Sequence, residues 1–253
     1  MSRSAITVAG LRGCDPVRLT ARSVVLSVLL GAHPAWASSS ELATLTADFG
    51  IRDATLRVAL TRMVGAGDLV RSADGYRLSD RLLARQRRQD DAIDPHEHPW
   101  DGSWTTLLIT SVGADARTRA DLRNTLLQNR FGELREGAWL RPDNLDAVLP
   151  EDVRARVRTL RSRDEDPADL VTQLWDLPSW AREGDRLLAE MAEAPDVPGR
   201  FVVAAAIVRH LLTDPVLPAE LLPRRWPGEQ LRSAYRDFAA ELVARRDSQV
   251  EAV

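Results

Sequence analysis

Apolar residues recur at helical spacing in three short segments near the start of the chain. In "LTARSVVLSVLLGAH", Thr20 is the expected N-cap and Val24, Val25, Val28 and Leu29 form the buried stripe. The second segment, "SSSELATLTADFG", has Ser39 or Ser40 as its cap and ends at Gly50. The third, "RDATLRVALTRMVGAG", starts behind Asp53 as a cap and ends at Gly65 and Gly67. These patterns predict three consecutive helices.

A tight hairpin follows the third helix. In "DLVRSADGYRLS", Leu69 and Val70 precede an Asp74-Gly75 turn, and Tyr76 and Leu78 follow it. Asp-Gly between apolar residues is a strong hairpin signal. Three helices and a hairpin predict a winged helix-turn-helix. With the arginine-rich helix "SDRLLARQRRQDDAI", this domain spans residues 18–94, behind a flexible N-terminal arm at 1–17.

The pattern changes after "DPHEHPWDG", a turn-rich joint with a domain boundary near Pro95. "SWTTLLITSV" reads as a strand, "ADARTRADLRNTLLQNRFGEL" as an amphipathic helix, and "GAWLRP" and "RARVRTLRSR" as two further strands. Together they predict a ferredoxin-like α+β domain at 95–165. Proline-broken helical segments from Asp166 predict a helical C-terminal domain at 166–253. The fold class is therefore α+β multidomain.

The third helix has an unusual outer face. When Leu56, Leu60, Met63 and Val64 point into the core, the face outside carries small, hydroxyl-bearing and basic residues. Such an outline lets a helix enter the DNA major groove, where arginine pairs with guanine and hydroxyls bond bases or phosphates. Arg71 and Arg77 flank the hairpin tip, where they would contact the DNA backbone or minor groove. The residues expected to bind DNA are Ser39, Arg52, Thr55, Arg57, Val58, Thr61, Arg62, Arg71 and Arg77.

Charge supports this interpretation, although the whole chain of 253 residues has a net charge of only −3. Residues 1–90 contain 13 arginines against 8 acidic residues, a net charge of +5, and the remainder has a net charge of −8. A basic first module suggests a nucleic-acid-binding part joined to a part with another role. A solvated arginine face on a helical domain of another purpose, such as a protein-interaction platform, is the alternative.

Catalytic and metal chemistry is not expected. The single cysteine, Cys14, excludes an internal disulfide and fits a reducing cytoplasm. Asp94, His96, Glu97 and His98 can bind metals but lie in the joint, where we expect a polar linker. A metal-dependent nuclease would need an acid at the end of its first strand, and "LLITSV" has none. We expect no catalytic residue, no metal and no cofactor.

Localisation turns on one misleading segment. "SVVLSVLLGAHPAWASSS" imitates a signal peptide, but a long region precedes it and its apolar run is short. No run is long enough to span a membrane. We expect a cytoplasmic protein with no membrane partner.

Several motifs, taken together, resemble the PaaX-type repressor family, regulators of phenylacetate catabolism. "LTARSVVLSVLL" and "LRVALTRMVGAGDL" are similar to the opening and recognition helices of the family. "WDGSWTTLLI" and "FGELREGAWLRP" resemble two blocks of its middle domain, and "LLTDPVLPAELLPRRWPG" resembles its C-terminal signature. Asp68 departs from the pattern, because the family usually has a large aromatic or apolar residue there.

The resemblance implies a homodimeric repressor with a Cas2-like ferredoxin middle domain. Its partners would be double-stranded operator DNA and an acyl-CoA effector, phenylacetyl-CoA in the best-known members. Seven tryptophans are present, and Trp104, Trp139, Trp175 and Trp226 are expected mainly as core or interface anchors. Some could instead form a ligand wall with arginines for CoA phosphates. The effector-binding candidates are Trp139, Arg141, Arg209 and His210, with a domain-interface role as the alternative for the last two.

Overall fold

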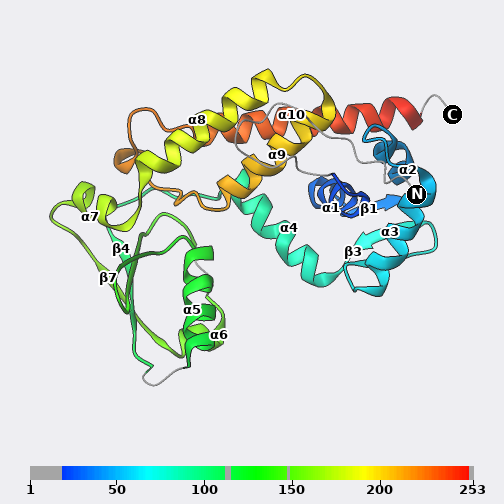
Figure 1. Cartoon of the computed structure of the whole chain (residues 1–253). Helices are drawn as coiled ribbons and strands as arrows, with labels where there is room; N and C mark the ends of the chain where they lie inside the picture. The colour runs from blue at the N-terminus through cyan, green and yellow to red at the C-terminus, as the bar shows by residue number, and fades with distance from the viewer. Residues whose placement is uncertain (1–18, 112–114, 147–148, 251–253) are drawn as a thin grey trace. The chain divides into compact units, whose positions relative to one another are not determined.

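The computed structural model describes residues 19–111, 115–146 and 149–250 (Figure 1). The expected arm at 1–17 lies outside them. The contacts divide the chain into two compact units, Met1–Ile93 with Arg186–Val208 and Gln230–Val253, and Asp94–Asp185 with Arg209–Glu229. The helical region expected as a separate domain at 166–253 is therefore divided between the two units, because its helices pack on two different cores.

The first unit contains the winged helix-turn-helix. Its helices are α1 (Ala21–Gly31), α2 (Ser39–Ala47), α3 (Asp53–Gly65) and α4 (Asp80–Ile93), and its strands are β1 (Trp36–Ser38), β2 (Leu69–Arg71) and β3 (Gly75–Leu78). The apolar stripes of α1, α2 and α3 meet in one core that also takes in Leu69 and Leu78 of the hairpin. The spacing of apolar residues predicted these three helices correctly, because the apolar stripe of each helix is buried in the core.

Two helix caps differ from the prediction. Thr20 caps α1 as expected, and its side chain accepts the backbone N–H of Ser23. Helix α2 is capped by Ser38 rather than by Ser39 or Ser40, because only the Ser38 side chain accepts the N–H of Glu41. The N-cap of α3 is Arg52, with no side-chain cap bond, so Asp53 is the first helical residue and not the cap.

Strand β1 was not predicted, and it explains Gly75. The sheet order is β1-β3-β2, and Ser38 of β1 pairs with Gly75 of β3. A Cβ atom at Gly75 would lie 2.3 Å from the carbonyl oxygen of Ala37. The hairpin prediction is right, but Gly75 does not have the positive φ of a type I′ turn. It is needed because β1 crosses close to its backbone.

Three later helices contribute to both units: α8 (Leu177–Glu193), α9 (Val197–Leu211) and α10 (Gly228–Val250). Within the first unit, Phe201 of α9 packs on Phe49 with ring centroids 4.8 Å apart, and on Phe238 of α10 at 6.5 Å. Arg232 of α10 donates to the carbonyl oxygen of Ala92 at 3.1 Å. These contacts join the C-terminal helices to the winged-helix core.

The second unit is built on a four-stranded antiparallel sheet. Its elements are β4 (Trp104–Ile109), α5 (Ala116–Gln128), β5 (Gly132–Arg135), β6 (Ala138–Pro142), α6 (Glu151–Arg154) and β7 (Val157–Ser162). The sheet order β5-β6-β4-β7 is the ferredoxin-like arrangement, which confirms the predicted topology. Strand β5 was missed, because the sequence was read as helix through "FGEL". Arg130, with φ of 66°, ends that helix before β5.

Each face of this sheet has its own cover. Leu107 and Trp139 pack with α5 on one face. Trp104 and Leu140 pack on the other with α7 (Pro167–Leu174) and with Leu217, just before the short helix η1 (Ala219–Leu221). In Figure 1, α5 lies along one side of the sheet.

The "TDPVLP" segment is fixed to this domain by side chains that donate to its backbone. Arg130 donates to the carbonyl oxygens of Leu211 and Leu212 at 3.1 and 3.0 Å. Asn144 donates to the carbonyl of Val216 at 3.0 Å. The segment therefore serves as a structural part of the second unit. None of the helices within the described ranges has the length and apolar character needed to cross a membrane.

Candidate nucleic-acid interface

The outer face of α3 is exposed. Leu56, Leu60 and Met63 are buried and Val64 is half-buried. On the opposite side Val58 is 52% exposed. The other exposed residues of the expected DNA-binding set on this helix and at its cap are Arg52, Thr55, Arg57, Thr61 and Arg62.

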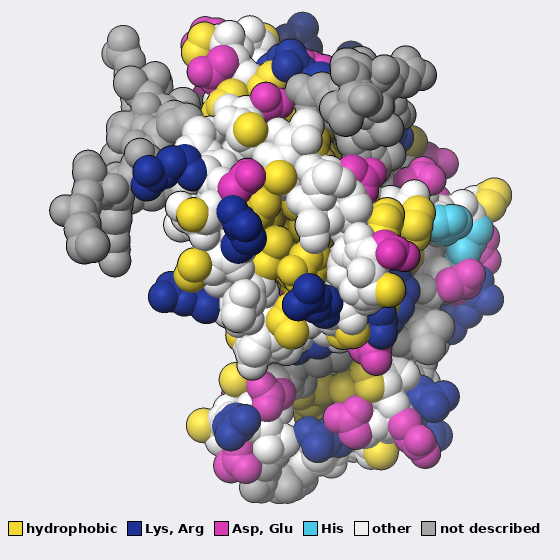
Figure 2. Space-filling view, turned by 90° about the vertical axis from the view of Figure 1, so that its right-hand side faces the viewer, with side chains coloured by type: hydrophobic (Ala, Val, Ile, Leu, Met, Phe, Trp, Pro, Cys, Tyr) yellow, Lys and Arg dark blue, Asp and Glu magenta, His cyan; other side chains and the backbone are white. Residues whose placement is uncertain are grey.

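The arginines of this face are free to bind an anion. Within the described residues, the side chains of Arg52, Arg57 and Arg62 have no hydrogen-bond or ion-pair partner. A guanidinium group can donate five hydrogen bonds, and these groups donate none to the described protein. Figure 2 shows one face of the molecule, on which separate basic side chains lie among apolar, acidic and other side chains.

The N-terminus of α2 offers backbone donors next to this face. Ser38 and Glu41 form a capping box, with bonds of 3.1 and 2.7 Å that use the N–H groups of these two residues. The N–H groups of Ser39 and Ser40 have no acceptor inside the helix, as is general for a first turn. A phosphate can bind such groups, and the predicted role of Ser39 is compatible with its exposed position.

The two wing arginines lie on opposite faces of the three-stranded sheet. Arg77 pairs with Trp36 on one side and Val70 on the other, so these three residues share the outward face. Arg71 pairs with Tyr76 and shares the face of Leu69 and Leu78, which packs on the core. Trp36 was missed with its strand, and its Nε1 donates to the Ser72 hydroxyl at 3.2 Å.

A buried carboxylate joins α1, the hairpin and α4. Asp68 is 2% exposed and accepts from Arg22 Nε and Nη2 at 3.1 and 2.8 Å, and from Arg81 Nη2 at 2.6 Å. The charge at this position is thus compensated by two arginines. Arg81 therefore has a structural partner, whereas Arg85 and Arg88 on the same helix remain exposed.

The first two effector candidates are buried in the middle domain. Trp139 is 1% exposed and packs between β6 and α5, with the Arg123 guanidinium 5.2 Å from its ring centroid. Arg141 lies 5.2 Å from the Phe131 ring and donates to the carbonyl of Leu145. Burial lowers the pKa of Arg141 to about 10. Both residues of the predicted ligand wall therefore lie inside the packed domain, because β6 is buried on both faces, and their role in effector binding stays a prediction.

The other two candidates differ in their surroundings. Arg209 is exposed. His210 stacks on Trp180 with ring centroids 4.1 Å apart, and its Nε2 lies 3.0 Å from the Trp180 carbonyl oxygen. Trp180 in turn stacks on Trp226 at 4.3 Å. No local sequence pattern indicates this three-ring stack, because its members are up to 46 positions apart.

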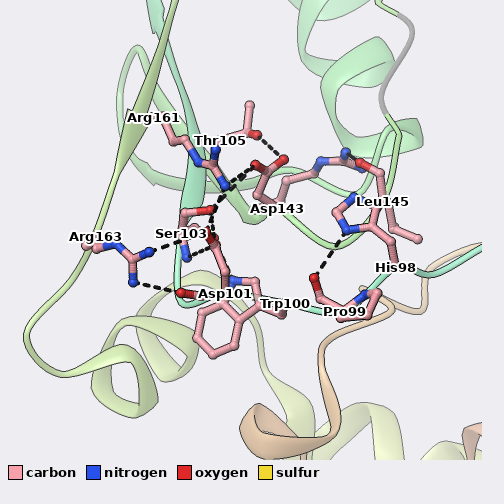
Figure 3. A network of polar contacts seen from close by, with 11 residues as sticks. His98, Pro99, Trp100, Asp101, Ser103, Thr105, Asp143, Leu145, Arg161 and Arg163 are labelled. Carbon is pink, nitrogen blue, oxygen red and sulfur yellow. Dashed lines mark hydrogen bonds and ion pairs between the residues drawn. The ribbon is translucent and has the colours of Figure 1, made fainter.

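A polar network lies where the middle domain begins (Figure 3). Asp101 accepts from the backbone N–H and hydroxyl of Ser103 and pairs with Arg161 and Arg163 at 3.0 and 3.3 Å. The bonds from Ser103, aided by the two arginines, lower the pKa of Asp101 to about 2. The arrangement fixes the turn that leads into β4.

Two of the linker residues that could ligate a metal contact other groups of the protein instead. Glu97 forms an isolated bridge with Leu145, and its carboxylate accepts from Asn144 at 3.3 Å. His98 Nδ1 lies 3.4 Å from the carbonyl of Pro99. Among the residues that the structure describes, no group of three or more His, Cys, Asp or Glu is placed to hold a metal ion.

The fold and this interface define the class of the protein: a winged helix-turn-helix joined to a ferredoxin-like domain. The domain described as "PaaX-like protein" matches residues 20–82, the "PaaX protein central Cas2-like domain" matches 97–170, and the "PaaX-like protein C-terminal domain" matches 179–252. The chain belongs to the PaaX family.

Two similar proteins support the assignment. The "Transcriptional repressor PaaX" of Escherichia coli is 31% identical over 223 residues, which cover 76% of this chain and 69% of that protein. The solved structure of the uncharacterized protein Rv0674 from Mycobacterium tuberculosis is 71% identical, with a TM-score of 0.82. The match covers 90% of this chain and 98% of the Mycobacterium chain.

Proposed function

We propose that this protein is a transcriptional repressor that binds double-stranded operator DNA through α3 and the wing. The observation that carries the proposal is the exposed α3 face, whose Arg57 and Arg62 lack partners among the described residues. Its similarity to the repressor from Escherichia coli supports the regulatory role. A homodimer would place two such helices on the half-sites of a pseudo-palindrome. The protein acts in the cytoplasm as a regulator and not as an enzyme.

Fluorescence anisotropy on the DNA upstream of its own gene tests the first part. Each arginine that pairs with a guanine contributes about 1–3 kcal/mol of discrimination. Arg57→Ala with Arg62→Ala should therefore weaken specific binding at least tenfold. Arg117→Ala with Arg158→Ala is the matched control, because it removes two exposed arginines from the middle domain. Unchanged binding by the α3 variant would reject this interface and favour a protein-interaction module.

The effector is the second part of the proposal. The family resemblance implies an acyl-CoA, with release of DNA as its effect and an aromatic-acid catabolic operon as the target. The ligand would favour a dimer geometry whose recognition helices no longer match the half-site spacing. It can shift the equilibrium only by the difference between its affinities for the two geometries.

Titrating phenylacetyl-CoA into the protein–DNA complex tests this part. Loss of anisotropy with phenylacetyl-CoA, but not with free phenylacetate or CoA, is the expected result. If no CoA ester changes specific DNA binding, the proposal of a repressor stands and the proposal of an acyl-CoA effector fails.

A further inference from the structure

The second unit contains a groove that the proposed DNA contacts do not explain. Its volume is about 740 Å³, within the range of small-molecule sites. Helix α7, the start of α8 and η1 form its walls, with Val171, Leu174, Leu221 and Leu222 as its apolar lining. All of these elements belong to the same compact unit.

Trp175 gives the groove an aromatic wall of fixed position. A Cβ atom at Gly132 would lie 3.0 Å from the Trp175 indole and 2.8 Å from the Leu174 side chain. The absence of a side chain at Gly132 therefore lets the indole lie directly on β5. Trp175 is half-buried, and its ring also lines the groove. A fixed, partly exposed indole suits the ring or acyl chain of a ligand.

Two arginines directly follow the groove lining along the chain. Arg224 and Arg225 directly follow the lining residue Pro223, and both are exposed without a side-chain partner among the described residues. Trp226, the next residue, is held by its stack on Trp180. The two arginines therefore lie in the chain between a residue of the groove and an anchored tryptophan. Guanidinium groups are well suited to phosphate oxygens.

From this juxtaposition we infer that the groove binds the acyl part of an acyl-CoA, while Arg224 and Arg225 bind its phosphates. The inference rests on the proposed function, since it gives a place to the proposed effector. It moves the proposed effector contacts from Trp139 and Arg141, which are buried, to the groove lining and the two exposed arginines that follow it in the chain.

Two acidic residues also line the groove, and replacing one of them tests whether the ligand is an anion or a cation. The carboxylate of Asp176 accepts the backbone N–H of Ser179 at 3.0 Å, so it is engaged at the start of α8. Glu220 is exposed. Glu220→Gln should tighten the binding of a polyanionic ligand by about two- to fivefold. The substitution removes one negative charge that repels the ligand, and the effect is small because water and salt screen an exposed charge. A cationic ligand would bind more weakly to the same variant.

The experiment measures phenylacetyl-CoA binding to the full chain by calorimetry. Arg224→Glu with Arg225→Glu should weaken binding at least tenfold and reduce its salt dependence. Arg117→Glu with Arg158→Glu is the control with the same charge change. Equal binding by wild type and the Arg224/Arg225 variant would overturn the inference, and weaker binding by Glu220→Gln would do so as well.

A thiol-protection measurement locates the acyl part. In a Cys14→Ser background, Gln173→Cys places the chain's only thiol on the groove lining, and Ala120→Cys places one on exposed α5. Phenylacetyl-CoA should slow maleimide labelling of the first thiol and leave the second unchanged. If the ligand releases DNA but protects neither thiol, the groove is wrong and the proposed function stands. If no acyl-CoA binds the protein or releases the DNA, the effector proposal fails, and the inference fails with it.

Discussion

The Asp68 network allows a stability prediction that can be worked from distances. The carboxylate accepts three hydrogen bonds of 2.6–3.1 Å from two guanidinium groups, and it is almost completely buried. Hydrogen bonds to charged groups contribute about 1.5–3 kcal/mol each. The side chains of Arg22 and Arg81 are 60% and 68% exposed, so water can replace much of the hydrogen bonding that they lose when the carboxylate is removed. We expect Asp68→Asn to lower the free energy of unfolding by about 2 kcal/mol.

Much of that loss comes from geometry rather than from charge alone. Asparagine has the size of aspartate, but one of its two acceptors becomes an NH₂ donor. That donor would face a guanidinium group in a buried position, and a buried group without a partner is costly. The network also ties α1 to α4 across the hairpin. The loss should therefore appear in the unfolding of the winged helix.

Urea unfolding followed by far-UV circular dichroism is the assay, with Asp74→Asn as the control. Asp74 is exposed at the wing tip, so its replacement should change the free energy of unfolding by less than about 0.5 kcal/mol. If Asp68→Asn falls inside the same limit, the three bonds contribute no net stability and the reasoning is refuted. A changed m-value would show instead that the unfolded or native state had changed in compactness.

Three further predictions follow from single positions. Gly75→Ala should lower the free energy of unfolding by about 1–3 kcal/mol, because the new methyl group would force β1 off β3. Gly65→Ala has open space around it and should be neutral or raise the free energy of unfolding by up to about 1 kcal/mol. Thermal unfolding of both variants checks this prediction. Arg77→Ala should weaken binding to all DNA sequences alike and reduce the slope of log K against log salt concentration by about 1. Arg71→Ala, on the face of the sheet that packs on the core, should have a smaller effect. Equal effects of the two variants in anisotropy would contradict the placement of Arg77 on the outward face. The pKa of Asp101 in the folded protein is about 2, below the usual value of 3.8, so its contribution to stability is present above pH 3.8 and is lost as the pH falls through about 2. Asp101→Asn should therefore flatten the dependence of stability on pH between these values, and an unchanged acid-unfolding curve would count against this prediction.

The helices of the winged domain could be predicted because each has a stripe long enough to show a period. Leu56, Leu60 and Met63 recur over two turns and are all buried. Strands β1 and β5 have three and four residues, too few for alternation to be visible, and β5 followed a strong helical pattern. The split of the C-terminal helices was also hidden, because spacing shows which face is apolar but not which core receives it.

The candidate site was predictable to a similar extent. Exposure of Arg57 and Arg62 followed from the position of the apolar stripe on the same helix. The partners of Asp68 lie 46 and 13 positions away and could not be read from local pattern. The burial of Trp139 could not be predicted, because a strand buried on both faces looks the same in sequence as one that borders a cleft.

Strand β1 links the two DNA-contacting parts more closely than a helix-turn-helix followed by a hairpin would suggest. Ser38 pairs with Gly75 in the wing sheet, and its side chain caps α2. A displacement of the wing therefore also shifts the N-terminus of α2, where the free N–H groups of Ser39 and Ser40 are placed to bind a phosphate. Gly75→Ala should disturb both contacts and lower the affinity for DNA by more than Arg77→Ala, which removes one charge and leaves β1 in place. Equal losses of affinity for the two variants would show that the wing and α2 contact DNA independently.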